Sequence, residues 1–181
     1  MKERLDIVIL GLSLSSSWGN GHATTFRALI RGLKADGHDV LFLERDVPWY
    51  ADQRDLPDPD FCDLAYYSDL NELTGTYADC LRAADAVIVG SYVPEGAAVI
   101  DKVAALHLKR LCFYDIDTPV TLAKLDRGDE EYLARRQVPL FDAYFSFSGG
   151  EVLERLEKRY GARRAMALYC SVDADRYEGT G

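Results

Sequence analysis

Residues 5–11 read Leu-Asp-Ile-Val-Ile-Leu-Gly, a nearly continuous apolar run that stops at a glycine. A strand that is buried on both faces of a parallel sheet has this composition. After a polar loop, apolar residues recur at helical spacing at positions 26, 29, 30 and 33, and Gly37-His38 gives a C-cap signal. A second apolar run follows at 40–43. The opening of the chain therefore predicts a strand, a helix and another strand.

The same alternation continues along the chain. Further strands are predicted at the apolar runs 63–68, 86–90, 110–114, 142–147 and 165–169. Helical spacing predicts helices at 73–84, at 99–106 with Pro94 in the first turn, and at 152–160. Repeated strand-helix alternation requires crossover helices on both faces of a mostly parallel sheet. We therefore expect a doubly wound, Rossmann-like α/β domain with three α/β/α layers.

Composition and charge exclude several classes of protein. A length of 181 residues allows one domain, and 48% hydrophobic with 28% charged residues is typical of a soluble globular chain. The formal net charge of −9 has the wrong sign for binding nucleic acid or an anionic membrane. No run approaches the roughly 18–20 apolar residues that span a bilayer. We expect a cytoplasmic protein without a transmembrane segment and without a nucleic-acid partner.

Neither the cysteines nor the aspartates indicate a metal site. The cysteines at 62, 80, 112 and 170 form no C-x-x-C pair and have no histidine close in sequence. We expect each to be reduced and in or near the core. The metal-binding pattern D-x-D occurs at 58–60, 115–117 and 173–175, and three matches in one acidic chain carry little information. No metal is predicted.

Ligands of doubly wound sheets bind at the carboxyl ends of the strands, where the strand order reverses. The segments that should line this edge are 13–22, 90–95, 115–119 and the helix start at 148–150. Ser148 and Glu95 equally suit a helix cap and a first helical turn. The candidate substrate-binding residues in these segments are Ser17, Trp18, Gly19, Asn20, Gly21, Ser91, Glu95, Thr118, Ser148, Gly149 and Gly150.

His22 is the strongest catalytic candidate in these segments. It falls in the first turn of the first predicted helix, where the positive end of the helix dipole lowers an imidazole pKa and favours the neutral form. A neutral imidazole accepts a proton and can act as general base toward a hydroxyl. Asp115 or Asp117 would orient it. The alternative is a surface histidine in a loop that only begins a helix.

A dinucleotide fingerprint is the alternative ligand site. Gly19-x-Gly21 precedes a helix, and Glu44 ends the second strand, where an acid that binds ribose would stand. The third position of the fingerprint is Thr24, and Gly19 lies eight residues beyond Gly11, outside the tight turn that the fingerprint requires. Binding of a nicotinamide dinucleotide therefore remains the second interpretation.

Several phrases resemble one family of enzymes. Residues 33–40, Leu-Lys-Ala-Asp-Gly-His-Asp-Val, look like the first helix and second strand of GT-B-fold glycosyltransferases. The phrases at 113–122 (FYDIDTPVTL), 147–150 (FSGG) and 168–173 (LYCSVD) are similar to bacterial glycosyltransferases of the spore-maturation-protein-like family. The resemblance covers essentially the whole chain.

The resemblance implies a division of labour between two Rossmann-like domains. The N-terminal domain, here residues 1–176, would bind a small-molecule or glycan acceptor. Residues 177–181 would begin the linker to a C-terminal domain that holds the nucleotide sugar, so this chain would carry no cofactor and be inactive alone. Some such enzymes use a histidine at the position of His22 as base. The surface that the second domain would cover could pair two copies into a homodimer. A non-catalytic interaction module is the alternative from another class.

Overall fold

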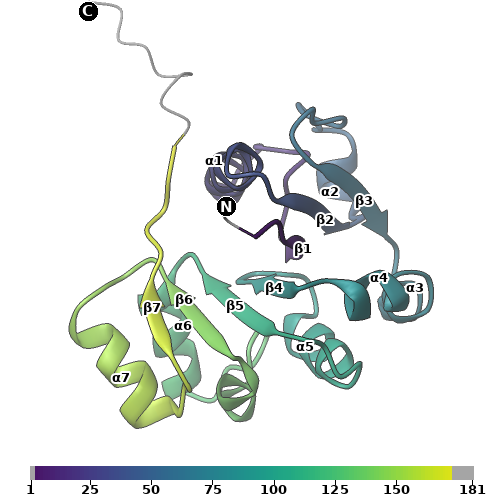
Figure 1. Cartoon of the computed structure of the whole chain (residues 1–181). Helices are drawn as coiled ribbons and strands as arrows, with labels where there is room; N and C mark the ends of the chain where they lie inside the picture. The colour runs from purple at the N-terminus through teal and green to yellow at the C-terminus, as the bar shows by residue number, and fades with distance from the viewer. Residues whose placement is uncertain (1–2, 173–181) are drawn as a thin grey trace, which may run out of the picture.

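The computed structural model describes residues 3–172 and shows a seven-stranded parallel sheet (Figure 1). The order across the sheet is β3-β2-β1-β4-β5-β6-β7, so the strand order reverses between β1 and β4. The predicted doubly wound α/β domain is confirmed. Residues 173–181, which include the third D-x-D match and the predicted linker, lie outside the described residues. The strands are β1 (Asp6–Gly11), β2 (Asp39–Arg45), β3 (Asp63–Tyr67), β4 (Ala86–Gly90), β5 (Leu111–Asp115), β6 (Ala143–Ser146) and β7 (Ala165–Ala167).

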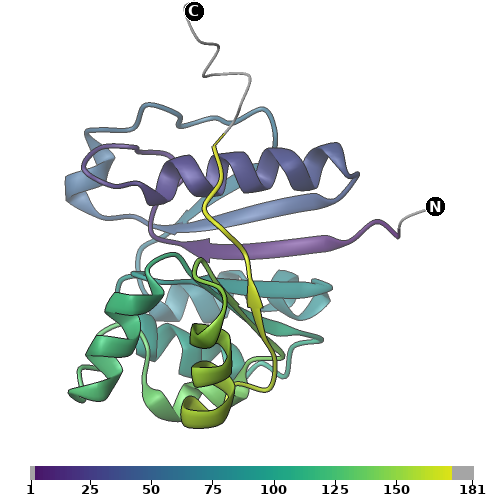
Figure 2. The same cartoon turned by 90° about the vertical axis from the view of Figure 1, so that its left-hand side faces the viewer.

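The helices lie unevenly on the two faces of this sheet (Figure 2). Apart from α1, the longer helices pack into one large cluster on one face. The opposite face carries α1 and the loop that contains α2. The helices are α1 (His22–Ala35), α2 (Pro48–Ala51), α3 (Leu70–Thr76), α4 (Ala78–Ala83), α5 (Gly96–Ala104), α6 (Thr118–Asp126) and α7 (Glu151–Tyr160), with a 3₁₀ helix, η1 (Arg135–Leu140).

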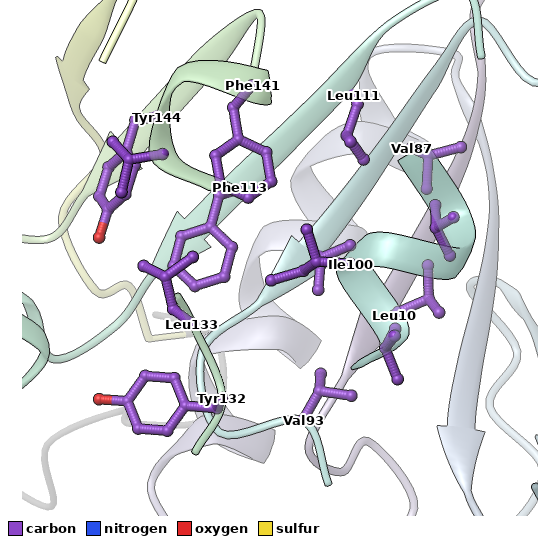
Figure 3. Close-up of a cluster of buried hydrophobic side chains, with 14 of the residues drawn as sticks. Leu10, Val87, Val93, Ile100, Leu111, Phe113, Tyr132, Leu133, Phe141 and Tyr144 are labelled. Atoms are coloured by element: carbon purple, nitrogen blue, oxygen red, sulfur yellow. The ribbon is translucent and has the colours of Figure 1, made fainter. Parts of the chain in front are cut away.

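The larger core cluster lies between the sheet and helices α3 to α7. Figure 3 shows part of this cluster. The ring of Phe113 in β5 packs against the rings of Phe141 and Tyr144, and Leu10 lies next to Ile100 of α5. These side chains are almost entirely removed from water. Burial of this apolar area is the main force that fixes the helices to the strands.

The smaller core cluster explains why two strands end in glycine. Phe26 of α1 lies edge-on to Phe42 and Tyr114, with ring centroids 5.2 and 6.0 Å apart. A Cβ atom at Gly90 would lie 2.8 Å from the Phe26 ring, and one at Gly11 would also overlap these rings. The glycines therefore allow α1 to pack against the ends of β1 and β4.

The end of α1 agrees with the sequence, because Gly37 takes the left-handed conformation (φ +92°). Its N–H donates to the carbonyl of Lys34, and the N–H of His38 donates to that of Leu33. This is the Schellman arrangement of a C-cap.

Several other boundaries correct the prediction. The helix predicted at 73–84 is two helices that meet at Tyr77, whose hydroxyl donates to the carbonyl of Tyr66 in β3. Pro94 is not in a first turn, because α5 begins at Gly96 after Glu95 has turned through the left-handed region. Ser148 is not a cap, since Gly150 stands at the N-cap of α7 without a side-chain cap. Helices α2, α6 and η1 were not predicted.

The cysteines follow the prediction only in part. All four are free thiols; Cys112 is buried, and Cys62 and Cys80 are partly buried. Cys170 is exposed, contrary to the expectation of a core position; it lies beyond β7, with its Sγ 4.0 Å from the carbonyl oxygen of Ile116. Within residues 3–172, no helix has the length and apolar character needed to cross a membrane.

Candidate functional site

The polar loop after β1 folds around the carboxylate of Glu44, at the end of β2. Oε2 of Glu44 accepts hydrogen bonds from the backbone N–H groups of Leu14 (2.7 Å) and Ser15 (2.9 Å). Oε1 accepts from the hydroxyls of Ser13 (3.2 Å) and Ser15 (2.7 Å). Glu44 is fully buried. This placement removes the ribose contact that the dinucleotide interpretation requires, because both oxygens of Glu44 face the loop.

A second carboxylate, that of Asp55, holds the outer part of the loop. Its two oxygens accept from the guanidinium of Arg27 at 2.8 and 2.9 Å, a bidentate pair. The same oxygens accept the N–H (2.8 Å) and the hydroxyl (3.1 Å) of Ser17. The hydrogen bond from Arg27 holds the pKa of Asp55 well below its usual range. The N–H and the hydroxyl of Ser17, which we had expected to meet substrate, are therefore both engaged inside the protein.

The rest of the loop leads into the first turn of α1. The side-chain oxygen of Asn20 accepts from the N–H of Ala23 (3.1 Å), so Asn20 caps the helix. Gly19 has φ +65°, and the Trp18 side chain is 57% exposed. Within residues 3–172, four backbone N–H groups of this segment have no hydrogen-bond partner, those of Gly19, Gly21, His22 and Thr24. These four groups can donate to a ligand at the start of α1.

His22 is the first residue of α1, as predicted. Its Nδ1 is buried without a hydrogen-bond partner, whereas Nε2 is not among the buried atoms. Burial lowers the pKa of His22 below its usual range, and the Asp117 carboxylate acts in the opposite direction. The predicted direction is confirmed, but desolvation is the main cause. His22 is therefore a neutral imidazole near pH 7 with one accessible nitrogen.

Tyr92 lies between Asp117 and His22 and contacts both side chains. The hydroxyl of Tyr92 donates to Oδ2 of Asp117 (3.2 Å), and the His22 ring meets the Tyr92 ring edge-on at 5.1 Å. Tyr92 itself has a left-handed backbone (φ 65°) and stacks on Tyr132 at 4.6 Å. Non-glycine residues with this backbone conformation cluster at functional sites. Within the described chain, His22 donates no hydrogen bond to Asp117, so the carboxylate acts on it electrostatically.

Asp115 is buried beneath this site and is not exposed on its surface. It is fully buried, and its oxygens accept from the hydroxyls of Tyr144 (2.6 Å) and Thr121 (2.8 Å) and from the N–H of Asp117 (3.2 Å). Thr121 lies 3.0 Å from the hydroxyl of Tyr132. Burial raises the pKa of Asp115 to about 6, against the opposing effect of these hydrogen bonds. Asp115 therefore fixes the backbone of Asp117 and does not orient His22 directly.

Two predicted substrate-binding residues are buried. Ser91 is fully buried, and its hydroxyl accepts the N–H of Ile116 (3.1 Å). Thr118 is also fully buried, and its hydroxyl lies 2.7 Å from that of Ser146. Both side chains join neighbouring strand ends and cannot contact a ligand in this structure. They shape the edge of the sheet.

The other predicted substrate-binding residues, Glu95 and those at 148–150, contact neighbouring parts of the protein or begin a helix. Glu95 turns away from the helix and pairs with Arg45 at 3.0 Å. The N–H of Ser148 donates to the hydroxyl of Ser146 (3.0 Å). Gly149 lies so close to Tyr169 that a Cβ atom would be 2.6 Å from the hydroxyl of that residue. Gly150 is the exposed N-cap of α7.

Sequence reasoning missed the aromatic part of the site. Tyr92 and Tyr132 lie 40 residues apart in sequence and meet only in the fold. The signal for Tyr92 was its place directly after β4, in a segment already assigned to this edge. Among the described residues, no group of three or more His, Cys, Asp or Glu side chains could hold a metal ion.

The fold is similar to those of solved sugar-nucleotide enzymes. An alpha-glucosyltransferase in complex with UDP-glucose and DNA containing an abasic site superposes with a TM-score of 0.62 at 17% identity, over 98% of this chain and 45% of that chain. The similarity shows a shared fold. The same holds for a UDP-GlcNAc 2-epimerase from Methanocaldococcus jannaschii (TM-score 0.54, 16% identity, 90% and 44%). This chain spans less than half of either protein. No family model and no curated protein matches the sequence.

Proposed function

We propose that residues 1–176 form the acceptor-binding half of a GT-B glycosyltransferase of the spore-maturation-protein-like family. The observation that carries this proposal is His22, a partly buried imidazole at the carboxyl edge of the sheet, held beside Asp117 with Nε2 accessible. The shared fold with a glucosyltransferase solved with UDP-glucose supports it. Fold alone does not establish an activity, so the proposal depends on the site.

In the proposed reaction, His22 removes the proton from an acceptor hydroxyl. The proton goes to Nε2, and the acceptor oxygen forms a bond to the anomeric carbon of the donor sugar. The bond between that carbon and the nucleoside diphosphate breaks, and the diphosphate leaves with the electron pair. Asp117 stabilises the imidazolium that results, because its carboxylate already favours the charged form of His22.

The donor belongs to a second domain in this proposal. Residues 177–181 begin the linker to it, and it holds the nucleotide sugar, so residues 1–181 need no cofactor and turn over nothing alone. The free N–H groups of Gly21 and His22 point to contacts with acceptor oxygens at the start of α1. A small molecule or a glycan in the cytoplasm is the acceptor.

DNA, which is present in the structure of the glucosyltransferase, is not the acceptor that we propose. Acidic residues outnumber basic ones in this chain by 30 to 21. A protein that binds a phosphate backbone neutralises it with Lys and Arg side chains. Here the basic residues close to the loop are already paired, as Arg27 is with Asp55 and Arg45 with Glu95.

The test is a transfer assay on the full-length protein with a panel of uridine nucleotide sugars. We expect release of UDP that depends on an added hydroxyl acceptor, and none from residues 1–181 alone. Calorimetric titration of residues 1–181 with a nicotinamide dinucleotide is the parallel experiment, in which we expect no binding. Tight dinucleotide binding, or a full-length protein that transfers no sugar, would refute the proposal.

A further inference from the structure

The carboxylate of Asp117 stands at the start of α6 but does not cap that helix. Asp117 is the N-cap residue, and within residues 3–172 its side chain accepts no hydrogen bond from the first turn. Aspartate is among the best N-cap residues, because its oxygens can accept the N–H of the third helical residue, which is Val120 here. Oδ2 accepts instead from the hydroxyl of Tyr92, at 3.2 Å. The carboxylate is therefore directed away from its own helix and toward Tyr92.

The sheet topology explains why Tyr92 lies beside both Asp117 and His22. Strand β4 lies between β1 and β5 in the sheet. His22 begins the helix that follows β1, Tyr92 follows β4, and Asp117 follows β5. Because the carboxyl ends of parallel neighbours meet at one edge, the residue after the middle strand lies between the other two.

The backbone of Tyr92 is strained. Its φ of 65° lies in the left-handed region, which residues with a Cβ atom adopt only at a cost. A glycine would adopt this conformation freely. Contacts of the tyrosine side chain therefore offset the strain. These contacts are with the rings of His22 and Tyr132 and with the carboxylate of Asp117.

Tyr132 supports the ring of Tyr92 from the larger core cluster (Figure 3). The two rings stack with their centroids 4.6 Å apart. Tyr132 is buried, and its hydroxyl lies 3.0 Å from that of Thr121. A Cβ atom at Gly96 would lie 2.5 Å from the carbonyl oxygen of Tyr132, so the glycine at the start of α5 permits this close approach. Tyr92 therefore packs against a residue that the core holds in place.

We propose that Tyr92 is a positioning residue, whose hydroxyl holds the Asp117 carboxylate beside His22 and away from the start of α6. Its importance for catalysis rests on the proposed function, in which Asp117 stabilises the imidazolium of His22. Tyr92 itself takes no proton from the acceptor. It acts on the reaction through Asp117.

The surroundings of His22 make its pKa a direct measure of this positioning. The charged group that acts on His22 is Asp117, from the start of α6, and the titratable group in contact with its ring is Tyr92, from the loop after β4. Burial lowers the pKa of His22, and the Asp117 carboxylate raises it. A carboxylate that moves away from the imidazole raises the pKa less.

The test measures the pKa of His22 by NMR of the imidazole in residues 1–181, so it requires no turnover. Tyr92→Phe removes the hydroxyl and keeps the ring, which leaves the burial of His22 unchanged. We expect Tyr92→Phe to lower the pKa of His22 by at least about half of the decrease that Asp117→Asn causes, because the released carboxylate can turn to the start of α6. The double variant Tyr92→Phe/Asp117→Asn should show no decrease beyond that of Asp117→Asn alone.

Tyr160→Phe is the matched control. The hydroxyl of Tyr160 also donates to an aspartate, at 2.6 Å from Oδ1 of Asp126. Tyr160 ends α7, at the opposite edge of the sheet from His22. This variant should leave the pKa of His22 at the wild-type value. The signals of His38 and His107 are internal references, whose pKa values should be the same in every variant.

Three NMR results would overturn the inference. They are an unchanged or raised pKa of His22 in Tyr92→Phe, a decrease that adds fully to that of Asp117→Asn, and an equal decrease in Tyr160→Phe. In the full-length protein, Tyr92→Phe should lower kcat for sugar transfer toward the value of Asp117→Asn, without a change in the KM for the nucleotide sugar. A full-length protein that transfers no sugar would refute the proposed function alone, since the NMR result decides the role of Tyr92.

Discussion

Replacing Glu44 tests how the loop before α1 is held. The carboxylate accepts four hydrogen bonds from Ser13, Leu14 and Ser15 in a fully buried position. Glu44→Ala leaves the N–H groups of Leu14 and Ser15 buried without an acceptor, at about 1–3 kcal/mol each. The hydroxyl of Ser13 still reaches the carbonyl of Ser16 at 3.1 Å. We therefore expect Glu44→Ala to lower the free energy of unfolding by about 2–6 kcal/mol.

Glu44→Gln separates the hydrogen bonds from the charge. The amide oxygen can still accept both N–H groups, so the expected loss is only about 1–2 kcal/mol. Urea unfolding followed by circular dichroism measures both variants, and Asp60→Ala at an exposed position should stay within about 0.5 kcal/mol of wild type. The reasoning fails if Glu44→Ala is as stable as Asp60→Ala, or if Gln costs as much as Ala.

Three further variants test the pH dependence of stability and the electrostatic environment of His22. The folded-state pKa of Asp115, about 6, lies above the reference value of 3.8. The free energy of unfolding of the wild type should therefore decrease by on the order of 3 kcal/mol as the pH rises from 4 to 6. Urea titrations at several pH values should show that Asp115→Asn lacks this decrease. The pKa of Asp55 is lowered by Arg27, so its stabilisation is fully present above about pH 4 and shrinks on acidification; Asp55→Asn should cost about 1–2 kcal/mol at pH 7, and a difference that does not shrink between pH 4 and pH 2 would contradict this. Asp117→Asn should lower the pKa of His22 further, as followed by NMR of the imidazole, and a rise would show that Asp117 is not its electrostatic partner.

The central strands could be predicted because most of their residues are buried. Runs such as 5–11 and 86–90 are almost entirely apolar, and β1 and β4 lie within them. The last strand is less regular. Its predicted span of 165–169 contains β7, which ends at Ala167 because the edge strand pairs on one side only.

The helices were harder to predict where the tertiary fold decides their ends. Tyr77 divides one amphipathic pattern into α3 and α4, and Gly75, two residues earlier, is a local signal for that break. Helix α6 did have a signal, since Thr118-Pro119 suits a helix start, but the segment was assigned to a ligand-binding loop. Pro94 misled in the opposite way, because the left-handed turn at Glu95 delays α5.

The location of the candidate site could be predicted from the sequence, but the roles of several of its residues could not. His22 stands at the start of α1 and Asp117 beside it, as the topology required. The buried roles of Ser91, Thr118 and Glu44 depend on partners that are distant in sequence. A polar residue at a strand end can face a ligand or tie two strand ends together, and only the fold distinguishes these outcomes.

The most direct test of the account is the turnover of full-length protein that carries His22→Ala, with His107→Ala as the control at an exposed position away from the site. A general base contributes about 10²–10⁴ to the rate. We predict that His22→Ala lowers kcat by a factor in this range without a change in the KM for the nucleotide sugar, and that His107→Ala matches wild type. Near-normal turnover of His22→Ala would contradict the role of His22 as base.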